Sequence, residues 1–338
     1  MDQLLQSSYL YGKTMVNQAF SQSNLETENL NTSHNSKAHL FDNGFTGLVW
    51  ICALSIVIIL AWMTWIVYHD AEPAIHKFGL SFLFSKEWYI SEDRFGGLPY
   101  IYGSIVSSLL ALIFAIPLGL SVAILTSEDL LPDWVKTPIG FMVELIASIP
   151  SVIVGLWGIF VFIPAINPLQ KWLFAHLGWI PFFSSEPFGP SMLIAGLILA
   201  VMILPTIAAI SRDVLLAIPP QLRSASMALG ATRWETIWRV MLPAASSGII
   251  GAIILGLGRA LGETMAVTMV IGNSDIISIS LLAPGYTIPS VLANQFAEAA
   301  GSLHIGALMY LSLILFVITL VVNSIAIVLV QLINKNRT

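Results

Sequence analysis

Long apolar runs separated by short polar connections make up most of the chain from residue 47 onward. A helix needs roughly 20 consecutive apolar residues to cross the ~30 Å hydrocarbon core of a bilayer. Six runs are long enough, and each predicts a membrane-spanning helix: residues 47–68, 103–126, 138–164, 191–210, 247–273 and 303–333. The pattern therefore predicts an all-α polytopic membrane protein, with a polar tail over residues 1–46 and a transmembrane domain over residues 47–335.

The composition supports this fold class. Apolar residues make up 57% of the 338 positions and charged residues only 10%, where a soluble globular chain carries about 25% charged residues. A soluble fold with so few charges could not cover so much apolar surface, whereas lipid solvates the outer face of membrane helices. The formal net charge of −5 also argues against a nucleic-acid-binding surface. Cys52 is the single cysteine, so an intrachain disulfide is impossible.

The connections between the spans indicate the orientation, because Lys and Arg accumulate on the cytoplasmic side of a membrane. Nine of the fourteen Lys and Arg residues fall on one side of the predicted topology: Lys13, Lys37, Lys136, Arg212, Arg223, Arg233, Arg239, Lys335 and Arg337. Four fall on the other side: Lys77, Lys86, Arg94 and Lys171. We therefore expect both termini in the cytoplasm of a cell whose plasma (inner) membrane holds the chain.

On the outer side, the connection over residues 168–187 is rich in Trp and Phe. Aromatic residues near the end of a span commonly form an interfacial belt. A docking ledge for an external partner is the alternative interpretation of the same residues.

The connection over residues 211–246 is the main cytoplasmic feature. Pro219 and Pro220 favour the start of a helix over residues 221–229, and Gly230 is placed to end it. A second helix is expected over residues 232–241, ended by Leu242 and Pro243. The first helix carries the small side chains of Ser224, Ala225, Ser226 and Ala228. Small residues allow close approach to a groove on another protein, although an elbow lying against the helix bundle would also fit.

Three ionisable residues lie within apolar runs: Glu144, Arg259 and Glu263. A charge at the bilayer centre costs at least ~2.5–3.5 kcal/mol, so each one needs a partner or water. Arg259 lies about 18 Å into the fifth predicted span, near the midplane, and an unbroken helix would place Glu263 on the same face one turn later. Small residues accompany both charges on that face, as in a helix that lines a crevice.

Two interpretations of this charged pair remain open. Arg259 and Glu263 can form a permanent ion pair that fastens the bundle. Alternatively, Arg259 meets an anionic substrate, since a guanidinium matches an oxyanion with two parallel hydrogen bonds, and Glu263 acts as a gate. Glu144 is then a candidate partner of Arg259 in the empty site. Pro150 interrupts the helix near Ser148 and Ser151, which could open a polar pocket there.

The cytoplasmic connection resembles the EAA loop of ABC importer permeases. The family pattern Glu-Ala-Ala, three residues, Gly, nine residues, Ile-x-Leu-Pro matches Ser224, Ala225, Ser226, Gly230 and VMLP at 240–243 in spacing. Ser224 replaces the family's Glu, which removes a charge from this position. The resemblance implies that the helix carrying Arg223 to Gly230, including Ala228 and Leu229, couples to a separate ATPase subunit.

Further segments resemble the PstC-type permease of the phosphate-specific ABC importer. These segments are KFGL at 77–80, YGS at 102–104, ELIASIPS at 144–151, GRALGETMAVT at 258–268, IGN at 271–273 and ANQFAEA at 293–299. The resemblance implies the type I importer (MetI-like) permease fold and import of inorganic phosphate into the cytoplasm. The residues implied in the pathway or its gating are Arg259, Glu263, Thr264, Glu144, Ser148 and Ser151.

The same resemblance implies the partners: a second permease of PstA type, a PstB-type ATPase dimer that binds ATP and Mg²⁺, and a PstS-type extracytoplasmic phosphate-binding protein. The chain itself is then no enzyme and binds no cofactor or metal, and membrane lipid surrounds it. The rival hypotheses are a permease for another oxyanion, such as molybdate or sulfate, and a proton-coupled secondary transporter. A membrane-embedded enzyme is disfavoured because the sequence offers no nucleophile motif or metal-ligand cluster.

The predicted topology can be tested with a reporter fused at Leu173. We expect the reporter to be extracytoplasmic, because this position follows the third span in a chain whose N-terminus lies inside. Alkaline phosphatase activity in cells measures the location, and the same reporter fused at Ser224 is the matched cytoplasmic control. An inactive phosphatase at Leu173 would contradict the topology.

Overall fold

A computed structural model describes residues 44–128 and 130–335. The predicted tail over residues 1–46 lies outside the described residues up to position 43. The chain divides into two units, Met1–Trp65 and Ile66–Thr338. Six described helices are long and apolar enough to cross a membrane, which confirms the predicted number: Gly44–Leu83, Leu98–Ser127, Ser151–Leu177, Met192–Leu216, Arg233–Gly262 and Ser302–Val328.

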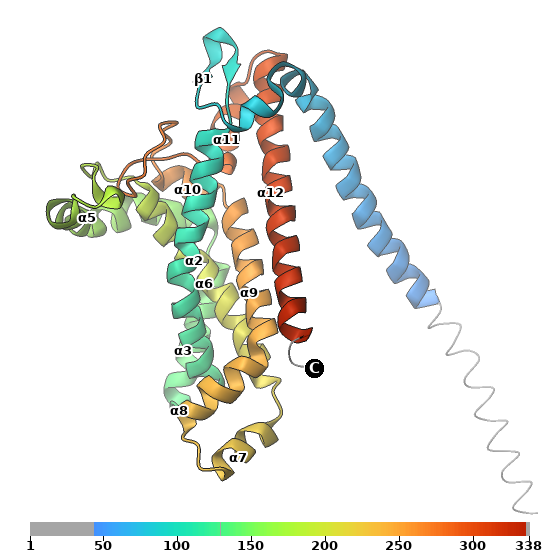
Figure 1. Ribbon diagram of the computed structural model, residues 1–338, viewed down its shortest axis with the longest axis vertical. Helices are drawn as coiled ribbons and strands as arrows, with labels where there is room; N and C mark the ends of the chain where they lie inside the picture. Colours follow the sequence, from blue (N-terminus) through green and yellow to red (C-terminus); the bar gives the residue numbers. More distant parts are fainter. Residues whose placement is uncertain (1–43, 129, 336–338) are drawn as a thin grey trace, which may run out of the picture. The chain divides into compact units, whose positions relative to one another are not determined.

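The second unit is a helix bundle with a small hairpin at one end and the 211–246 connection at the other (Figure 1). Its α-helices are α2 (Leu98–Ser127), α3 (Asp133–Ser148), α4 (Ser151–Trp157), α5 (Ile163–Leu177), α6 (Met192–Leu216), α7 (Pro220–Ala228), α8 (Arg233–Thr236), α9 (Leu242–Gly262), α10 (Met265–Val270), α11 (Ile288–Gln295) and α12 (Ser302–Lys335). The 3-10 helices are η1 (Gly79–Leu83), η2 (Ile90–Glu92), η4 (Pro181–Phe183) and η6 (Phe296–Glu298), and the π-helical turns are η3 (Gly158–Phe162) and η5 (Ile237–Met241). Strands β1 (Trp88–Tyr89) and β2 (Arg94–Phe95) pair antiparallel.

The centre of this unit is the packing of α2 against α6, which α9 also joins. Apolar side chains of α2, α6 and α10 interlock in one buried cluster, exemplified by Ala115, Ile203 and Val267. Gly196 on α6 lies directly against Leu110 of α2, since a Cβ added there would fall 2.5 Å from a Leu110 methyl carbon. Such close approach is typical of membrane helices, whose association depends on packing.

The third predicted span is wrong in its boundaries. Residues 138–164 do not form one helix, because α3 ends at Ser148 and α4 begins at Ser151. Ile149 has an extended backbone (ψ 126°), as the residue before a proline prefers, and Pro150 has no N–H to continue the helix. The membrane-crossing helix of this region is instead Ser151–Leu177, formed by α4, η3 and α5.

The fifth predicted span is also broken. The segment over residues 247–273 leaves the helix after Gly262, where Glu263 has an extended backbone (ψ 126°), and a short helix, α10, follows. At the other end, Leu242 and Pro243 do not end the second connection helix as predicted. The helix continues from Arg233 to Gly262 through Pro243, and the wide turn η5, which ends at Met241 two residues before the proline, accommodates its ring.

The 211–246 connection otherwise forms as predicted. Helix α7 begins at Pro220 and ends at Ala228, and Gly230 adopts a left-handed backbone (φ +88°) that reverses the chain. The Thr232 side chain and the Glu235 carboxylate cap each other's backbone N–H groups, which fixes the start of α8. The described α7 contains no buried residue, so its position depends on polar attachments at its ends and along one side.

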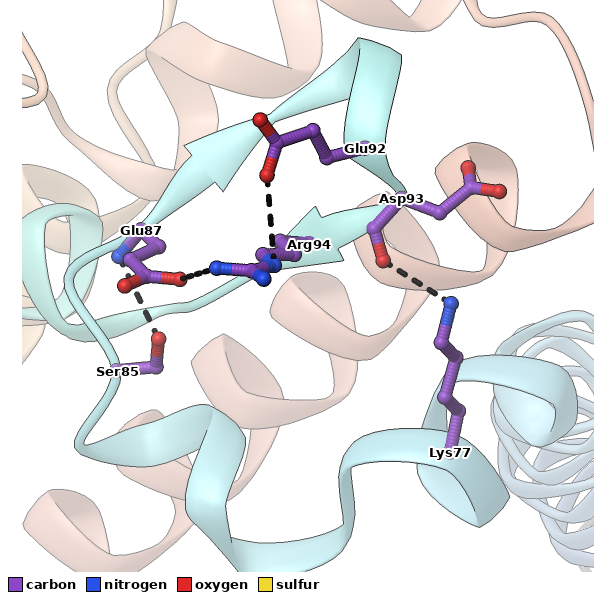
Figure 2. A network of polar contacts seen from close by, with 6 residues as sticks. All are labelled: Lys77, Ser85, Glu87, Glu92, Asp93 and Arg94. Carbon is purple, nitrogen blue, oxygen red and sulfur yellow. Dashed lines mark hydrogen bonds and ion pairs between the residues drawn. The ribbon is translucent and has the colours of Figure 1, made fainter.

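The hairpin at the opposite end carries a small network of charges (Figure 2). Arg94 lies 3.6 Å from the Glu87 carboxylate and 3.5 Å from that of Glu92, and Lys77 donates to the Asp93 carbonyl oxygen (3.1 Å). These groups are exposed and contribute little to stability. The buried side anchors the hairpin better, since Trp88 contacts Phe95 edge to face and donates from its indole N–H to Gln295 Oε1 (3.0 Å).

Gly103 allows α2 to touch the chain before α11. A Cβ added at Gly103 would lie 2.0 Å from the carbonyl oxygen of Tyr286. The contact is fixed by the Ser104 hydroxyl, which accepts a hydrogen bond from the Ile288 N–H (2.8 Å).

Gly103→Ala should therefore lower the stability of the protein by about 2 kcal/mol or more, since the backbone must shift to admit the methyl group. Thermal unfolding of the detergent-solubilised protein measures the effect. Gly251→Ala on α9 is the matched control, because its Cβ would meet nothing within 4 Å. Equal melting temperatures for the two variants would contradict the close contact.

Candidate functional site

Arg259 occupies the last turn of α9 and borders a cleft of about 690 Å³. Its Nη1 donates a hydrogen bond to the hydroxyl of Thr206 on α6 (3.2 Å). The cleft lies between α6, α9 and α12, and its lining includes the amide side chain of Asn323. A guanidinium, a hydroxyl and an amide therefore face one volume that is otherwise apolar. Each of these groups can donate a hydrogen bond to an oxyanion.

Glycine lines the α9 wall of this site. Gly251, Gly258 and Gly262 each have open space where a Cβ would be. Arg259 itself is exposed. Of the small residues predicted to share a face with Arg259, Gly262 is uncovered, whereas Ala252 and Gly256 are buried against the rest of the chain. A membrane helix with an open, glycine-lined face is suited to close packing against a further helix or to lining a path.

Arg259 also borders a second cavity, of about 360 Å³, at the interruption between α3 and α4. Ile146, Ile149 and Ile153 line this cavity from one side, and Val201 and Met202 of α6 line it from another. The guanidinium is therefore placed between two openings. The break at Pro150, predicted to open a pocket, does border a cavity, but mainly apolar side chains line it.

Glu263 and Thr264 lie at the break between α9 and α10. The Glu263 carboxylate accepts a hydrogen bond from the Ala266 N–H (3.3 Å) and so caps the start of α10. The Thr264 hydroxyl donates to the Gly262 carbonyl oxygen (3.2 Å), and its own carbonyl oxygen accepts from Thr268. Among the described residues, Arg259 and Glu263 form no ion pair, and the broken helix removes the shared face that an unbroken helix predicts.

Glu144 lies beside Arg212 rather than beside Arg259. The two residues line a pocket of about 320 Å³ that also includes Lys136 and Gly140. Arg212 reaches over α3, since a Cβ at Gly140 would lie 3.8 Å from its Nη1. The predicted pairing of Glu144 with Arg259 is therefore absent from the part of the chain that the structure describes.

The two serines of the predicted site are placed at the α3–α4 interruption. The Ser148 hydroxyl donates to the Leu145 carbonyl oxygen within its own helix (2.8 Å). Ser151 is the first residue of α4. Neither residue lines the two cavities that Arg259 borders.

The residues expected to meet an ATPase divide into two groups. Ala225, Ala228 and Leu229 are exposed, Leu229 by 90%. The hydroxyl of Ser224 is also exposed but donates back to carbonyl oxygens of its own helix, at 3.1 and 3.2 Å. Arg223 and Ser226 instead turn toward the rest of the chain: Arg223 Nη2 lies 2.8 Å from Glu128 Oε1, and the Ser226 and Thr236 hydroxyls lie 3.0 Å apart.

Thr206, Asn323 and Arg212 are site residues that the sequence prediction missed. Asn323 carried a usable signal, because an amide inside an apolar span needs a reason to be there. The sequence around Thr206 and Arg212 gave no such signal. Both residues lie on α6, and they join the site only because α9 and α3 pack beside them. No group of three or more His, Cys, Asp or Glu side chains able to hold a metal ion occurs among the residues searched, which are the described ones.

Comparison with known proteins gives a consistent result. Residues 115–338 match the family described as "Binding-protein-dependent transport system inner membrane component". The phosphate transport system permease protein PstC of Pasteurella multocida is 41% identical over 304 residues, which is 88% of this chain and 94% of that protein. PstC of Xylella fastidiosa (strain Temecula1) is 44% identical over 260 residues, covering 75% and 80% of the two chains.

Similarity extends to a more distant organism and to a solved structure. The probable phosphate transport system permease protein PstC of Methanocaldococcus jannaschii is 38% identical over 267 residues, 77% of this chain and 84% of that protein. The fold matches a chain of the crystal structure of a bacterial alginate ABC transporter in complex with an alginate-bound periplasmic protein. The TM-score is 0.54 at 15% identity, with 82% of this chain and 92% of that chain covered.

The cleft beside Arg259 should contain water, and cysteine labelling can show it. In a Cys52→Ser background, Asn323→Cys should react about tenfold faster with a hydrophilic maleimide than Ile325→Cys, since a thiol reacts as its thiolate in water. Ile325 is the matched control because it is exposed on the same helix but does not line the cleft. The measurement is the labelling rate in membrane vesicles. Equal rates would mean that the cleft is dry.

Proposed function

Because this chain belongs to the family of binding-protein-dependent transport system inner membrane components, we propose that it is the permease subunit that carries inorganic phosphate across the membrane. Six apolar helices and the family together make it a multi-pass protein of the inner membrane. The phosphate specificity is supported by relatives named PstC that are 41% and 44% identical over most of their length.

The single observation that carries the proposal is the position of Arg259 between two cavities. A guanidinium stays charged when it is partly buried and presents a planar fork that fits two phosphate oxygens. Thr206 accepts a hydrogen bond from this fork, so its own hydroxyl proton is available to an anion. Asn323 adds an amide donor on the opposite wall of the cleft.

Glu263 is better suited to gating than to binding phosphate, since a carboxylate repels an oxyanion. It caps α10 at the point where α9 ends, so a movement of α10 would move this negative charge relative to Arg259. Thr264, at the same break, would share that movement. We infer that Glu144 acts at a different point of the pathway from Arg259, where it faces Arg212. Ser148 and Ser151 then form the flexible connection between α3 and α4.

The open glycine face of α9 supports a second permease subunit of PstA type as the neighbour of this chain. The exposed residues of α7 and the turn after it, including Leu229, support a partner on the same side as Arg212 and Arg223. We propose that this partner is a PstB-type ATPase dimer, which holds the ATP and Mg²⁺, so that this chain binds neither. A PstS-type binding protein would then deliver phosphate at the hairpin end, and both termini would face the cytoplasm.

The experiment is phosphate uptake by the complete importer in proteoliposomes, energised with ATP on the side of α7. Arg259→Ala should lower uptake about 100-fold, and Arg259→Lys about tenfold, because an ammonium keeps the charge but loses the bidentate fork. Arg239→Lys in the 211–246 connection is the matched control, since Arg239 is exposed and borders neither of the two cavities beside Arg259.

Full uptake by a well-assembled Arg259→Ala complex would overturn the role of Arg259. Uptake of sulfate or molybdate in place of phosphate by the unmodified complex would assign the chain to another oxyanion. Uptake that continues without the ATPase and stops when the proton gradient collapses would instead show a secondary transporter.

A further inference from the structure

Arg223, on the helix expected to receive the ATPase, points toward Glu128 and the end of α6. Its Nη2 lies 2.8 Å from Glu128 Oε1, and the two side chains are 25% and 13% exposed. The same nitrogen donates to the Leu215 carbonyl oxygen at the end of α6 (3.4 Å). Nε of Arg223 is buried and has no hydrogen-bond partner, and among the described residues Glu128 is the carboxylate that compensates the charge of this guanidinium.

Glu128 directly follows the last residue of α2 and is its C-terminal capping residue. Its backbone N–H bonds to the Ile124 carbonyl oxygen, so the backbone of Glu128 is attached to the last turn of that helix. The ion pair therefore joins α7 to the end of α2 across 95 positions of sequence. Helix α2 packs along α6, and α6 carries Thr206, the hydrogen-bond partner of Arg259. The Glu128–Arg223 ion pair therefore connects the exposed helix α7 with the helices that position Arg259.

Few other contacts hold α7 in place. The helix has no buried residue, and its second polar attachment is the Ser226–Thr236 contact, which leads into α8 and α9. A cavity of about 140 Å³ lies between α7 and the chain, bordered by Glu128, Arg223 and Met227. Because apolar packing is incomplete here, α7 could move without α2 if the ion pair were absent.

We propose that the Glu128–Arg223 ion pair is the positioning element that makes α2 follow α7, so that closure of the ATPase is transmitted to the transport pathway. This inference rests on the proposed function, since it needs an ATPase that moves α7. Ser224 stands where the EAA pattern has Glu, so α7 has no carboxylate of its own that could form a charged link. The pair thus supplies, inside the chain, a charged link between α7 and the span bundle.

The test compares phosphate uptake with ATP hydrolysis in the complete reconstituted importer. Glu128→Gln and Arg223→Gln should each lower uptake about tenfold while hydrolysis stimulated by the loaded binding protein falls by no more than about twofold. The charge exchange Glu128→Arg with Arg223→Glu should restore at least half of the uptake per ATP, as expected for two residues that act through each other. Arg223→Lys should lie between the unmodified complex and Arg223→Gln.

A matched control is Ser121→Ala on α2, which removes an exposed hydroxyl that bonds to the Pro117 carbonyl oxygen of the same helix. Its uptake per ATP should be unchanged. The amount of assembled complex, measured by size-exclusion chromatography, accompanies every variant. Loss of uptake and hydrolysis in equal proportion, unchanged uptake, or a charge exchange no better than the single variants would each overturn the inference.

The test separates this inference from the proposed function. If the unmodified complex carries another oxyanion, phosphate specificity is wrong, and uptake per ATP is measured with that anion. If the unmodified complex transports normally and the ion-pair variants keep their uptake per ATP, the proposed function stands and the coupling role of the pair is wrong.

Discussion

A charge in the hydrocarbon core of a membrane must be paired or hydrated, and Arg259 satisfies this condition without a carboxylate partner among the described residues. Its one hydrogen bond goes to a neutral hydroxyl, Thr206, and the rest of the guanidinium faces open cavities. An unpaired guanidinium costs at least ~2.5–3.5 kcal/mol at the bilayer centre unless water reaches it. The site therefore has to be wet, and a wet cationic site among membrane-spanning helices is suited to receive a hydrated anion.

The two interrupted helices follow from the same constraint. Backbone N–H and C=O groups at membrane depth can leave a helix only where protein or water satisfies them. The breaks at Ile149–Pro150 and at Glu263–Thr264 both lie near Arg259, one beside a cavity that it borders and the other at the end of its own helix. At the second break, the Glu263 carboxylate and the Thr264 hydroxyl bond to backbone groups freed by the interruption.

The sequence predicted the number of spans because bilayer thickness acts on each apolar run separately. It also predicted α7, since Pro220 and Gly230 act within a few residues of the helix that they begin and end. It did not predict that the fifth span breaks, because Gly262, Glu263 and Thr264 are compatible with a continuous helix. The sequence could not predict the neighbours of Glu144 and Arg223. Arg212 comes beside Glu144, and Glu128 beside Arg223, only when the helices that carry them pack together.

These contacts explain how a force applied outside the bilayer can reach its centre. Helices and tight packing transmit displacement, whereas an exposed loop dissipates it, and a coupling route needs contacts that persist from end to end. Helix α2 extends from the Glu128 carboxylate to Gly103, where it touches the Tyr286 carbonyl oxygen at the opposite end of the unit. A displacement of α2 would therefore act on α6, which holds Thr206, and on the chain before α11 together. Helix α2 can in this way link the two ends of the unit and the site without any direct contact between them.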